Sequence, residues 1–95
     1  MSVNMSGKKD AERRHHYLKI LPEYYNSIDS GEKSFEVRCN DRNYHIHDIL
    51  HLQEWFDGDY TGREIAVEVT YLLDDPGYCK DGYVIMAISR NWESE

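Results

Sequence analysis

Residues 33 to 42 carry a dense set of polar side chains. Lys33, Glu36 and Arg38 place one carboxylate between two cations, and Arg42 follows a stretch of turn-forming residues. A carboxylate in this setting is stabilised as an anion, and a lysine held beside it can serve as a base or bind an anion. An alternative interpretation is a solvated face of alternating charges. The candidate ligand-binding residues are Lys33, Glu36, Arg38, Asn40, Asp41, Arg42 and Tyr44.

Histidines and a cysteine raise the question of a metal site. His45, His47 and His51 share strand parity, and Cys39 lies nearby in the sequence. Zinc sites use four converging ligands, usually in close pairs, and the chain has no C-x-x-C pair. The loop aspartates lack the regular spacing of a calcium loop. We therefore predict no metal and no cofactor, and interpret the histidines as exposed residues of a sheet.

The elements that must position the cluster follow from hydrophobic periodicity. Leu18 and Ile20 alternate with polar neighbours, which predicts a strand over 16–20. Pro22 suits the first turn of a helix and Gly31 suits its C-terminal stop, so a helix is predicted over 22–30. Further alternating runs predict four strands at about 34–38, 48–55, 65–73 and 83–89. Turn formers between 57 and 62 predict a long hairpin connection.

The strand that carries the cluster has two different faces. Glu36 and Arg38 point to one side, and Phe35 and Val37 point to the other. Because apolar faces are usually buried, we expect Phe35 and Val37 in the core. The complete predicted core is Leu18, Ile20, Ile28, Phe35, Val37, Leu50, Leu52, Val67, Val69, Val84, Met86 and Ile88.

One helix followed by strands without βα alternation argues against a doubly wound parallel sheet. The predicted fold class is α+β, mainly β, with a small antiparallel barrel or curved sheet of about five strands and one helix after the first strand. Residues 1–14 are polar and aperiodic, so they are predicted to be a disordered leader without function. Residues 15–95 are predicted to form one domain.

Charge and composition exclude several classes of function. The net charge is -7, and the segment after residue 14 holds 7 basic against 16 acidic side chains. Because non-specific affinity for nucleic acid comes from cations that neutralise phosphates, binding to long duplex DNA is not expected. A local basic pocket could still take a nucleotide or a short single strand. No apolar run approaches the roughly 20 residues of a membrane span, and no signal peptide precedes the two cysteines, so we expect a cytoplasmic protein with free thiols.

The segment Gly31-x-Lys33-x-x-Glu36-x-Arg38 resembles the G-x-K-x-x-E-x-R signature of ASCH domains in the PUA-like superfamily. More closely, the chain resembles an uncharacterised ASCH-like family of bacteria and phages over roughly residues 15 to 90. The matching segments are His16 to Ile20, Tyr24 to Tyr25, Gly31 to Arg38, Asn40 to Arg42, Asp48 to Glu54, Tyr60 to Arg63, Val69 to Tyr71 and Gly82 to Val84. The resemblance implies a PUA-like barrel and an RNA-binding module whose signature lines a cleft between the helix and the barrel.

Two positions depart from what the resemblance implies. The family commonly has Gly before the Asp that opens the third strand, where this chain has His47. Some ASCH relatives are amidohydrolases that use a Lys and a Thr three residues later, but Glu36 stands at that Thr position. The hydroxyl nucleophile is absent, so the amidohydrolase mechanism does not carry over as it stands.

The sequence and the resemblance together favour a domain that recognises a single-stranded or modified RNA or a nucleoside ligand. Arg38 and Arg42 would hold phosphate or a base edge, Lys33 an anionic oxygen, and Glu36 would orient Lys33 or accept from a base amino group. Tyr44 is a candidate to stack on a base, although core packing is its alternative role. The alternatives are a small hydrolase, an amidohydrolase or a ribonuclease, in which Lys33 and Glu36 act as acid and base, and a phage or mobile-element accessory domain that binds a protein partner.

Overall fold

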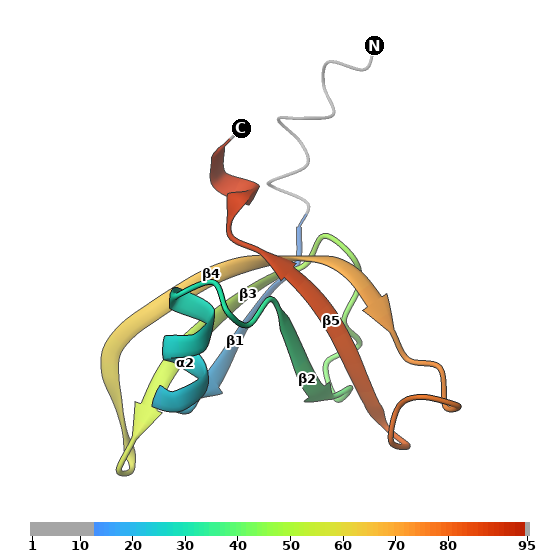
Figure 1. Ribbon diagram of the computed structural model, residues 1–95, viewed down its shortest axis with the longest axis horizontal. Helices are drawn as coiled ribbons and strands as arrows, with labels where there is room; N and C mark the ends of the chain where they lie inside the picture. Colours follow the sequence, from blue (N-terminus) through green and yellow to red (C-terminus); the bar gives the residue numbers. More distant parts are fainter. Residues whose placement is uncertain (1–12, 95) are drawn as a thin grey trace.

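A computed structural model describes residues 13–94 of the chain (Figure 1). The predicted architecture of five strands, with an α-helix after the first, is confirmed for this part of the chain. Residues 1–12 of the predicted leader lie outside the described residues. The elements are β1 (His15–Ile20), α2 (Pro22–Asp29), β2 (Phe35–Cys39), β3 (Ile49–Phe56), β4 (Asp59–Leu73), β5 (Tyr83–Ser89) and a 3-10 turn η1 (Asn91–Ser94).

The strands form one mixed sheet that curls into a half-barrel, seen as an arch in Figure 1. Its strand order is β1-β3-β4-β5-β2. β1 pairs with β3 in parallel, and the other three pairings are antiparallel. The first and second strands of the chain are therefore the two edges of the sheet. The pocket described below lies between these two edge strands.

The helix α2 forms because its ends are well specified and one face is apolar. Pro22 occupies the first turn, where its missing N–H costs no hydrogen bond. Tyr25 and Ile28 are buried in the core, whereas Tyr24 remains partly exposed. The helix ends before Gly31, whose φ of 87° is in the left-handed region that glycine enters without strain.

The hydrophobic core lies on the concave side of the half-barrel. Ten of the twelve predicted core residues are buried. The other two, Phe35 and Val37, are 45% and 50% exposed, whereas Glu36 between them is only 4% exposed. The predicted alternation of β2 is confirmed. The prediction that Phe35 and Val37 face the core is wrong, because the face that carries Glu36 is the buried one. Two cations contact Glu36, and this pairing makes its burial tolerable.

The connection between β3 and β4 is shorter than the sequence predicted. Asp57 and Gly58 have φ values of 55° and 85° and form the turn by themselves. Positive φ at both central residues matches the twist of antiparallel strands, which makes Asp-Gly a favoured hairpin pair. Thr61 and Gly62 therefore lie inside β4, opposite a register shift in β3 between Gln53 and Trp55.

Arg13 and Arg14 belong to the folded part, although the sequence placed them in the leader. The carbonyl oxygen of Arg14 accepts from the Ile49 amide at 2.8 Å. Arg13 forms an ion pair with Glu68 at 3.6 Å, and its guanidinium lies over the ring of Trp92. On the convex side of the sheet, Trp92 donates its indole N–H to Ala66 O at 3.1 Å.

The sulfur atoms of Cys39 and Cys79 are not bonded to each other, as predicted. Cys79 is buried and donates to Leu73 O, whereas Cys39 is exposed. Within residues 13–94, none of the helical segments has the length and apolar character that a membrane crossing needs.

The turn before β3 yields a test of backbone strain. His47 has a φ of 82°, which lies in the left-handed region that is unfavourable for residues with a Cβ atom. Since both substitutions remove the imidazole and its contact with Glu68, His47→Gly should be more stable than His47→Ala by about 0.5 to 1 kcal/mol. Chemical denaturation of the two variants measures this difference. Equal stability of the two variants would show that the turn relaxes out of the left-handed region.

Candidate ligand-binding pocket

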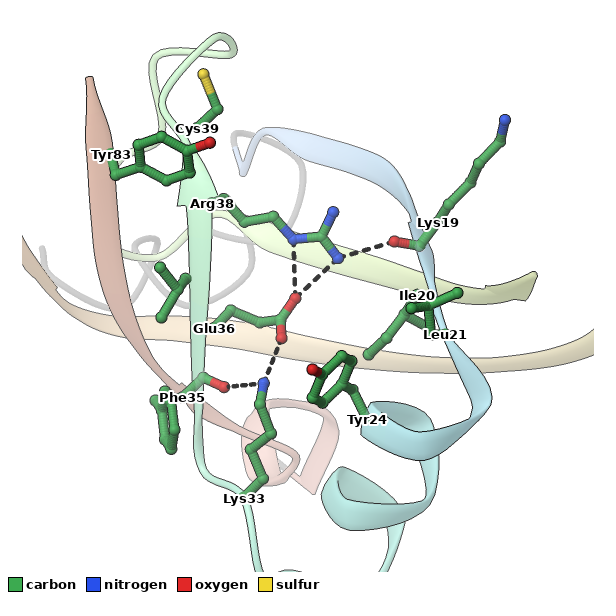
Figure 2. A pocket seen from close by; sticks show the side chains of 11 residues that line it. Lys19, Ile20, Leu21, Tyr24, Lys33, Phe35, Glu36, Arg38, Cys39 and Tyr83 are labelled. Carbon is green, nitrogen blue, oxygen red and sulfur yellow. Dashed lines mark hydrogen bonds and ion pairs between the residues drawn. The ribbon is translucent and has the colours of Figure 1, made fainter. Parts of the chain in front are cut away.

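A pocket of about 550 Å³ opens between β1, the start of α2 and the edge strand β2 (Figure 2). It lies where the curled sheet fails to close, because the two edge strands face each other there without strand pairing. Its size is in the range of small-ligand sites. The residues that line it are Lys19, Ile20, Leu21, Tyr24, Lys33, Phe35, Glu36, Val37, Arg38, Cys39 and Tyr83.

The centre of the pocket wall is a carboxylate held by two cations. Lys33 Nζ donates to Glu36 Oε1 at 2.6 Å. Arg38 approaches the other oxygen, Glu36 Oε2, with Nε at 2.9 Å and Nη2 at 2.8 Å. Figure 2 shows the three side chains in one continuous row. We call Lys33, Glu36 and Arg38 the triad.

The triad also connects the two edges of the half-barrel. Arg38 Nη2 donates to the carbonyl oxygen of Lys19 in β1 at 2.9 Å. Lys33 Nζ donates to the carbonyl oxygen of Phe35 in β2 at 2.6 Å. Edge strands expose backbone groups that need partners, and here charged side chains supply them. The side chains therefore bridge an opening that the backbone leaves in the sheet.

Part of the hydrogen-bonding capacity of the triad remains for a ligand. An ammonium group has three donors, of which Lys33 uses two in the contacts above. Arg38 uses Nε and Nη2, and Nη1 makes no hydrogen bond with any described residue. Two cations and one carboxylate leave a local charge of about +1 in a chain whose net charge is -7. The pocket can therefore attract one anionic group against the field of the whole protein.

Aromatic rings flank the triad, and the sequence analysis did not identify them. Tyr24 of α2 and Phe35 of β2 have their ring centroids 5.7 Å and 4.8 Å from Lys33 Nζ. Tyr83 of β5 enters the pocket because it pairs with Cys39. Tyr24 and Phe35 lie near Lys33 in the sequence and could have been included by proximity. Tyr83 could not, because it depends on a long-range strand pairing.

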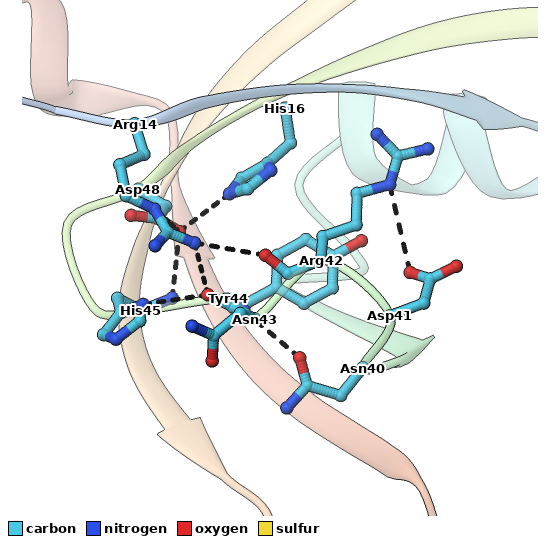
Figure 3. Close-up of polar contacts among 9 residues, drawn as sticks. All are labelled: Arg14, His16, Asn40, Asp41, Arg42, Asn43, Tyr44, His45 and Asp48. Carbon is cyan, nitrogen blue, oxygen red and sulfur yellow. Dashed lines mark hydrogen bonds and ion pairs between the residues drawn. The ribbon is translucent and has the colours of Figure 1, made fainter.

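The predicted site residues divide into two groups. Lys33, Glu36 and Arg38 line the pocket, and the other four lie in the turn that follows β2 (Figure 3). Asn40 Oδ1 accepts from the Tyr44 amide at 3.2 Å, which stabilises that turn. Arg42 reaches the Tyr17 carbonyl oxygen of β1 at 3.4 Å, and the exposed carboxylate of Asp41 lies 3.9 Å from Arg42 Nε.

Tyr44 is a core residue and does not face the pocket. Its ring packs edge-on against His16 with centroids 4.9 Å apart. The side chain is buried, and this burial raises the pKa of its phenol above the ordinary value. The faces of the Tyr44 ring are therefore not free to stack on a base. Core packing, the alternative role considered for Tyr44, fits its position.

A second buried carboxylate, Asp48, fixes the turn to the start of β1. Its Oδ2 atom accepts from the His45 amide at 2.9 Å and lies 2.8 Å from His16 Nε2. Arg14 lies 3.6 Å from the same oxygen and donates to the carbonyl oxygens of Arg42 and Asn43 (Figure 3). This network fixes the backbone position from which the Arg42 side chain extends.

The histidines singled out in the sequence contact carboxylates and carbonyl oxygens of the sheet and its turns. His47 Nδ1 lies 2.8 Å from Glu68, and His51 Nδ1 lies 2.9 Å from Glu64. The His51 hydrogen bond lowers the pKa of the Glu64 carboxyl. His45 Nδ1 lies 2.8 Å from the Asn43 carbonyl oxygen. Among residues 13–94, no three histidine, cysteine or acidic side chains converge as metal ligands would.

A third buried carboxylate, Glu54, holds the far end of β3. Arg63 donates to it through Nε at 2.9 Å and Nη2 at 2.8 Å, and the Thr61 hydroxyl donates to the same group. These hydrogen bonds, with the Arg63 contribution largest, lower the pKa of Glu54 from 4.5 to about 2. Arg63 also donates to Asn26 of α2 and lies over the ring of Tyr25, so the pair joins the hairpin to the helix.

The fold and the site define a small half-barrel domain with an ion-paired pocket between its edge strands. The chain belongs to the family described as "Domain of unknown function (DUF3850)", whose model matches residues 15–88. It is 35% identical over 71 residues to a protein of Escherichia phage P2 described as "Uncharacterized 12.9 kDa protein in GpA 3'region". The match covers 75% of this chain and 64% of the phage protein, so the chain spans less than two thirds of that relative.

These matches agree with the predicted resemblance to an uncharacterised family found in phages. The family match begins at the first residue of β1 and ends one residue before the end of β5. It therefore contains the whole sheet except Ser89, the helix α2 and all three members of the triad.

The Glu54 pair predicts a defined pH dependence of stability. Well above pH 4.5 the carboxylate is ionised in both the folded and the unfolded chain, and its stabilising contribution is complete. As the pH falls from 4.5 towards 2, the unfolded chain takes up a proton that the folded chain does not, so this contribution is lost. Glu54→Gln should therefore show a shallower loss of stability over this window than the unmodified protein.

Urea denaturation at several pH values measures the effect. Glu32→Gln is a suitable control, because Glu32 is exposed and its carboxylate forms no ion pair with any described residue. The same flattening in both variants would contradict a specific role for the Glu54–Arg63 pair.

Proposed function

We propose that this protein is an ASCH-like domain of the PUA-like superfamily that works in the cytoplasm and binds a nucleotide-containing ligand, a single-stranded or modified RNA, in the pocket between β1, α2 and β2. One observation carries the proposal. The segment that resembles the ASCH signature provides all three residues of the triad, and the triad lies in the wall of a ligand-sized pocket between helix and half-barrel.

The donors of the triad suit the oxygen atoms of a nucleotide. The remaining N–H of Lys33 and the Nη1 group of Arg38 are the groups that a phosphate or a base carbonyl would contact. Glu36 keeps both cations in fixed positions, so a ligand meets donors that are already oriented. Its own oxygens are largely occupied, which makes Glu36 a positioning residue and only a secondary acceptor for a base amino group.

The aromatic rings of the pocket suit a base. Phe35 and Tyr24 are partly exposed, and Tyr83 is half-buried, among the residues that line the pocket. Stacking of a base on an aromatic side chain contributes about 1 to 3 kcal/mol in single-strand recognition. We assign the stacking of a base to the rings that line the pocket and not to Tyr44.

The ligand is expected to be short. Arg38 and Arg42 contact β1 carbonyl oxygens two residues apart, Lys19 and Tyr17, so their guanidinium groups follow one edge of the half-barrel. Two such cations can accompany a few nucleotides of a single strand. A long polyanion would meet the negative field of a chain with net charge -7, which opposes extended binding.

The proposal predicts that Arg38→Ala weakens binding of a labelled single-stranded RNA of about six nucleotides by about 1 to 3 kcal/mol. Fluorescence anisotropy at low salt measures this loss. Arg90→Ala is the matched control, because it also removes one cation but lies at the surface beside Asp29. Its effect on affinity should be small.

Two further variants separate binding from folding. Arg38→Lys keeps a charge beside Glu36 but loses the forked geometry, so it should keep the thermal midpoint while losing part of the affinity. Affinity should fall with salt along a shallow slope that reflects two or three phosphate contacts. Equal losses from Arg38→Ala and Arg90→Ala, or no saturable binding at low salt, would contradict the proposal.

A further inference from the structure

Tyr17 on the edge strand β1 has one ring face covered and one face open. The covered face stacks on His51 of β3, with ring centroids 4.3 Å apart and an angle of 8° between the two planes. In the described sheet β1 has β3 on one side and no strand on the other, so the second face of the ring is turned towards this open edge. Tyr17 is 55% exposed, and among residues 13–94 no other ring or cation lies over its ring.

The ring of Tyr17 is held in place from behind. His51 Nδ1 lies 2.9 Å from Glu64 Oε2, and His51 Nε2 lies 2.9 Å from His15 Nδ1. The side chain of His51 is only 14% exposed, so these contacts keep its ring in one plane. Tyr17 stacks on that plane and therefore presents a ring whose orientation is already set. A ligand that stacks on such a ring loses less entropy than one that must first order a mobile side chain.

The open face of Tyr17 is connected to the pocket through Lys19. The two side chains lie on the same face of β1, because residues two apart in a strand point to the same side. Lys19 also lines the pocket, and Figure 2 shows its side chain extending away from the triad. Its ammonium group lies 3.8 Å from the ring centroid of Trp55 and forms no ion pair with any described residue. Lys19 therefore marks the passage from the pocket to the outer side of β1.

A second cation, Arg42, reaches the same strand from the turn after β2. Its Nη1 atom donates to the carbonyl oxygen of Tyr17 at 3.4 Å, and Arg38 of the triad donates to the carbonyl oxygen of Lys19 at 2.9 Å. Carbonyl groups two residues apart in a strand are separated by about 7 Å, a length that one nucleotide of an extended single strand spans. The two guanidinium groups are therefore spaced to contact successive phosphates.

Two carboxylates limit the positive charge at this surface. Asp41 lies 3.9 Å from Arg42 Nε, and Glu64 belongs to β4, on the far side of β3 from Tyr17. The net positive charge beside the ring is therefore small. Stacking does not depend on that charge, and every base offers a face for it. The surface consequently suits a base that brings a single phosphate better than it suits a long polyanion.

We propose that the open face of Tyr17 is a second base-binding site for the single strand that occupies the pocket, with Arg42 contacting the phosphate next to that base. The inference rests on the proposed function, since it requires an RNA strand in the pocket. It adds a path, in which the strand leaves the pocket past Lys19 and follows the open edge of β1 towards Tyr17. A mononucleotide fills the pocket alone, whereas a longer strand contacts both positions.

Two ligands of different length test the second site. Tyr17→Val removes the ring but keeps a residue that suits a strand. It should weaken binding of labelled hexaadenylate, measured by fluorescence anisotropy at low salt, by about fivefold or more. The affinity for adenosine monophosphate, measured by NMR titration, should stay the same. Tyr17→Phe keeps the ring and should bind both ligands as the unmodified protein does.

Tyr71→Val is the matched control, because Tyr71 is 62% exposed on β4, which β3 separates from β1. It should change neither affinity, and circular dichroism should show the unmodified fold in both valine variants. Three results would each overturn the second site. These are unchanged hexaadenylate binding by Tyr17→Val, an equal loss by Tyr71→Val or Tyr17→Phe, and an equal loss of both ligands by Tyr17→Val.

The salt dependence of binding tests the phosphate contact of Arg42. Arg42→Gln should reduce the slope of log affinity for hexaadenylate against log salt concentration by about 1, because one phosphate contact is lost. The affinity for adenosine monophosphate should not change, since Arg42 does not line the pocket. An unchanged slope would contradict the path along β1.

Arg38→Ala separates a failure of this inference from a failure of the proposed function. If Arg38→Ala weakens binding of both ligands while Tyr17→Val weakens neither, the pocket binds the nucleotide and the second site is wrong. If Arg38→Ala weakens neither, the proposed function fails and the second site fails with it. Losses of hexaadenylate affinity in both variants, with adenosine monophosphate affected by Arg38→Ala alone, are the expected result.

Discussion

The burial of Glu36 between Lys33 and Arg38 is the interaction on which the functional architecture depends. A buried carboxylate is costly unless opposite charges and hydrogen bonds compensate it, and here both oxygens are engaged. The compensating cations then have capacity left to hold backbone groups of β1 and β2. One ion-paired group thus turns an incomplete barrel into a defined pocket. Loss of Glu36 would leave two neighbouring cations without their counter-charge.

The other buried carboxylates have related roles at other junctions of the fold. Among the described residues, the buried polar side chains are Glu36, Asp48 and Glu54. Asp48 joins the turn after β2 to the start of β1, and Glu54 joins the β3–β4 hairpin to α2 through Arg63. Glu36 lies on the edge strand β2, Glu54 lies at the register shift between β3 and β4, and Asp48 directly precedes β3. The hydrophobic core packs the sheet, and the carboxylates specify how its irregular parts meet.

Sequence patterns predicted the elements well because alternation and turn chemistry are local. The helix limits followed from Pro22 and Gly31, and the alternating runs located the strands. Alternation also showed that Glu36 and Arg38 share a face, but it could not show which face of β2 meets the core. The pocket depends on pairings between distant segments, such as Tyr83 with Cys39 and Arg38 with Lys19. Arg13 and Arg14 were missed because their partners, Glu68 and Asp48, are far away in the sequence.

Side-chain NMR of Arg38 tests the central claim most directly, namely that the triad in this pocket contacts the ligand. The Nε–H of Arg38 donates to Glu36, so its resonance reports on the triad itself. Addition of a short single-stranded RNA should shift this resonance and the backbone amides of Val37, Cys39 and Tyr83, which line the pocket. The Nε–H of Arg63, bound to Glu54 at the far end of β3, should stay unchanged. Saturable binding that left the Arg38 resonance in place, or shifted Arg63 equally, would contradict the account.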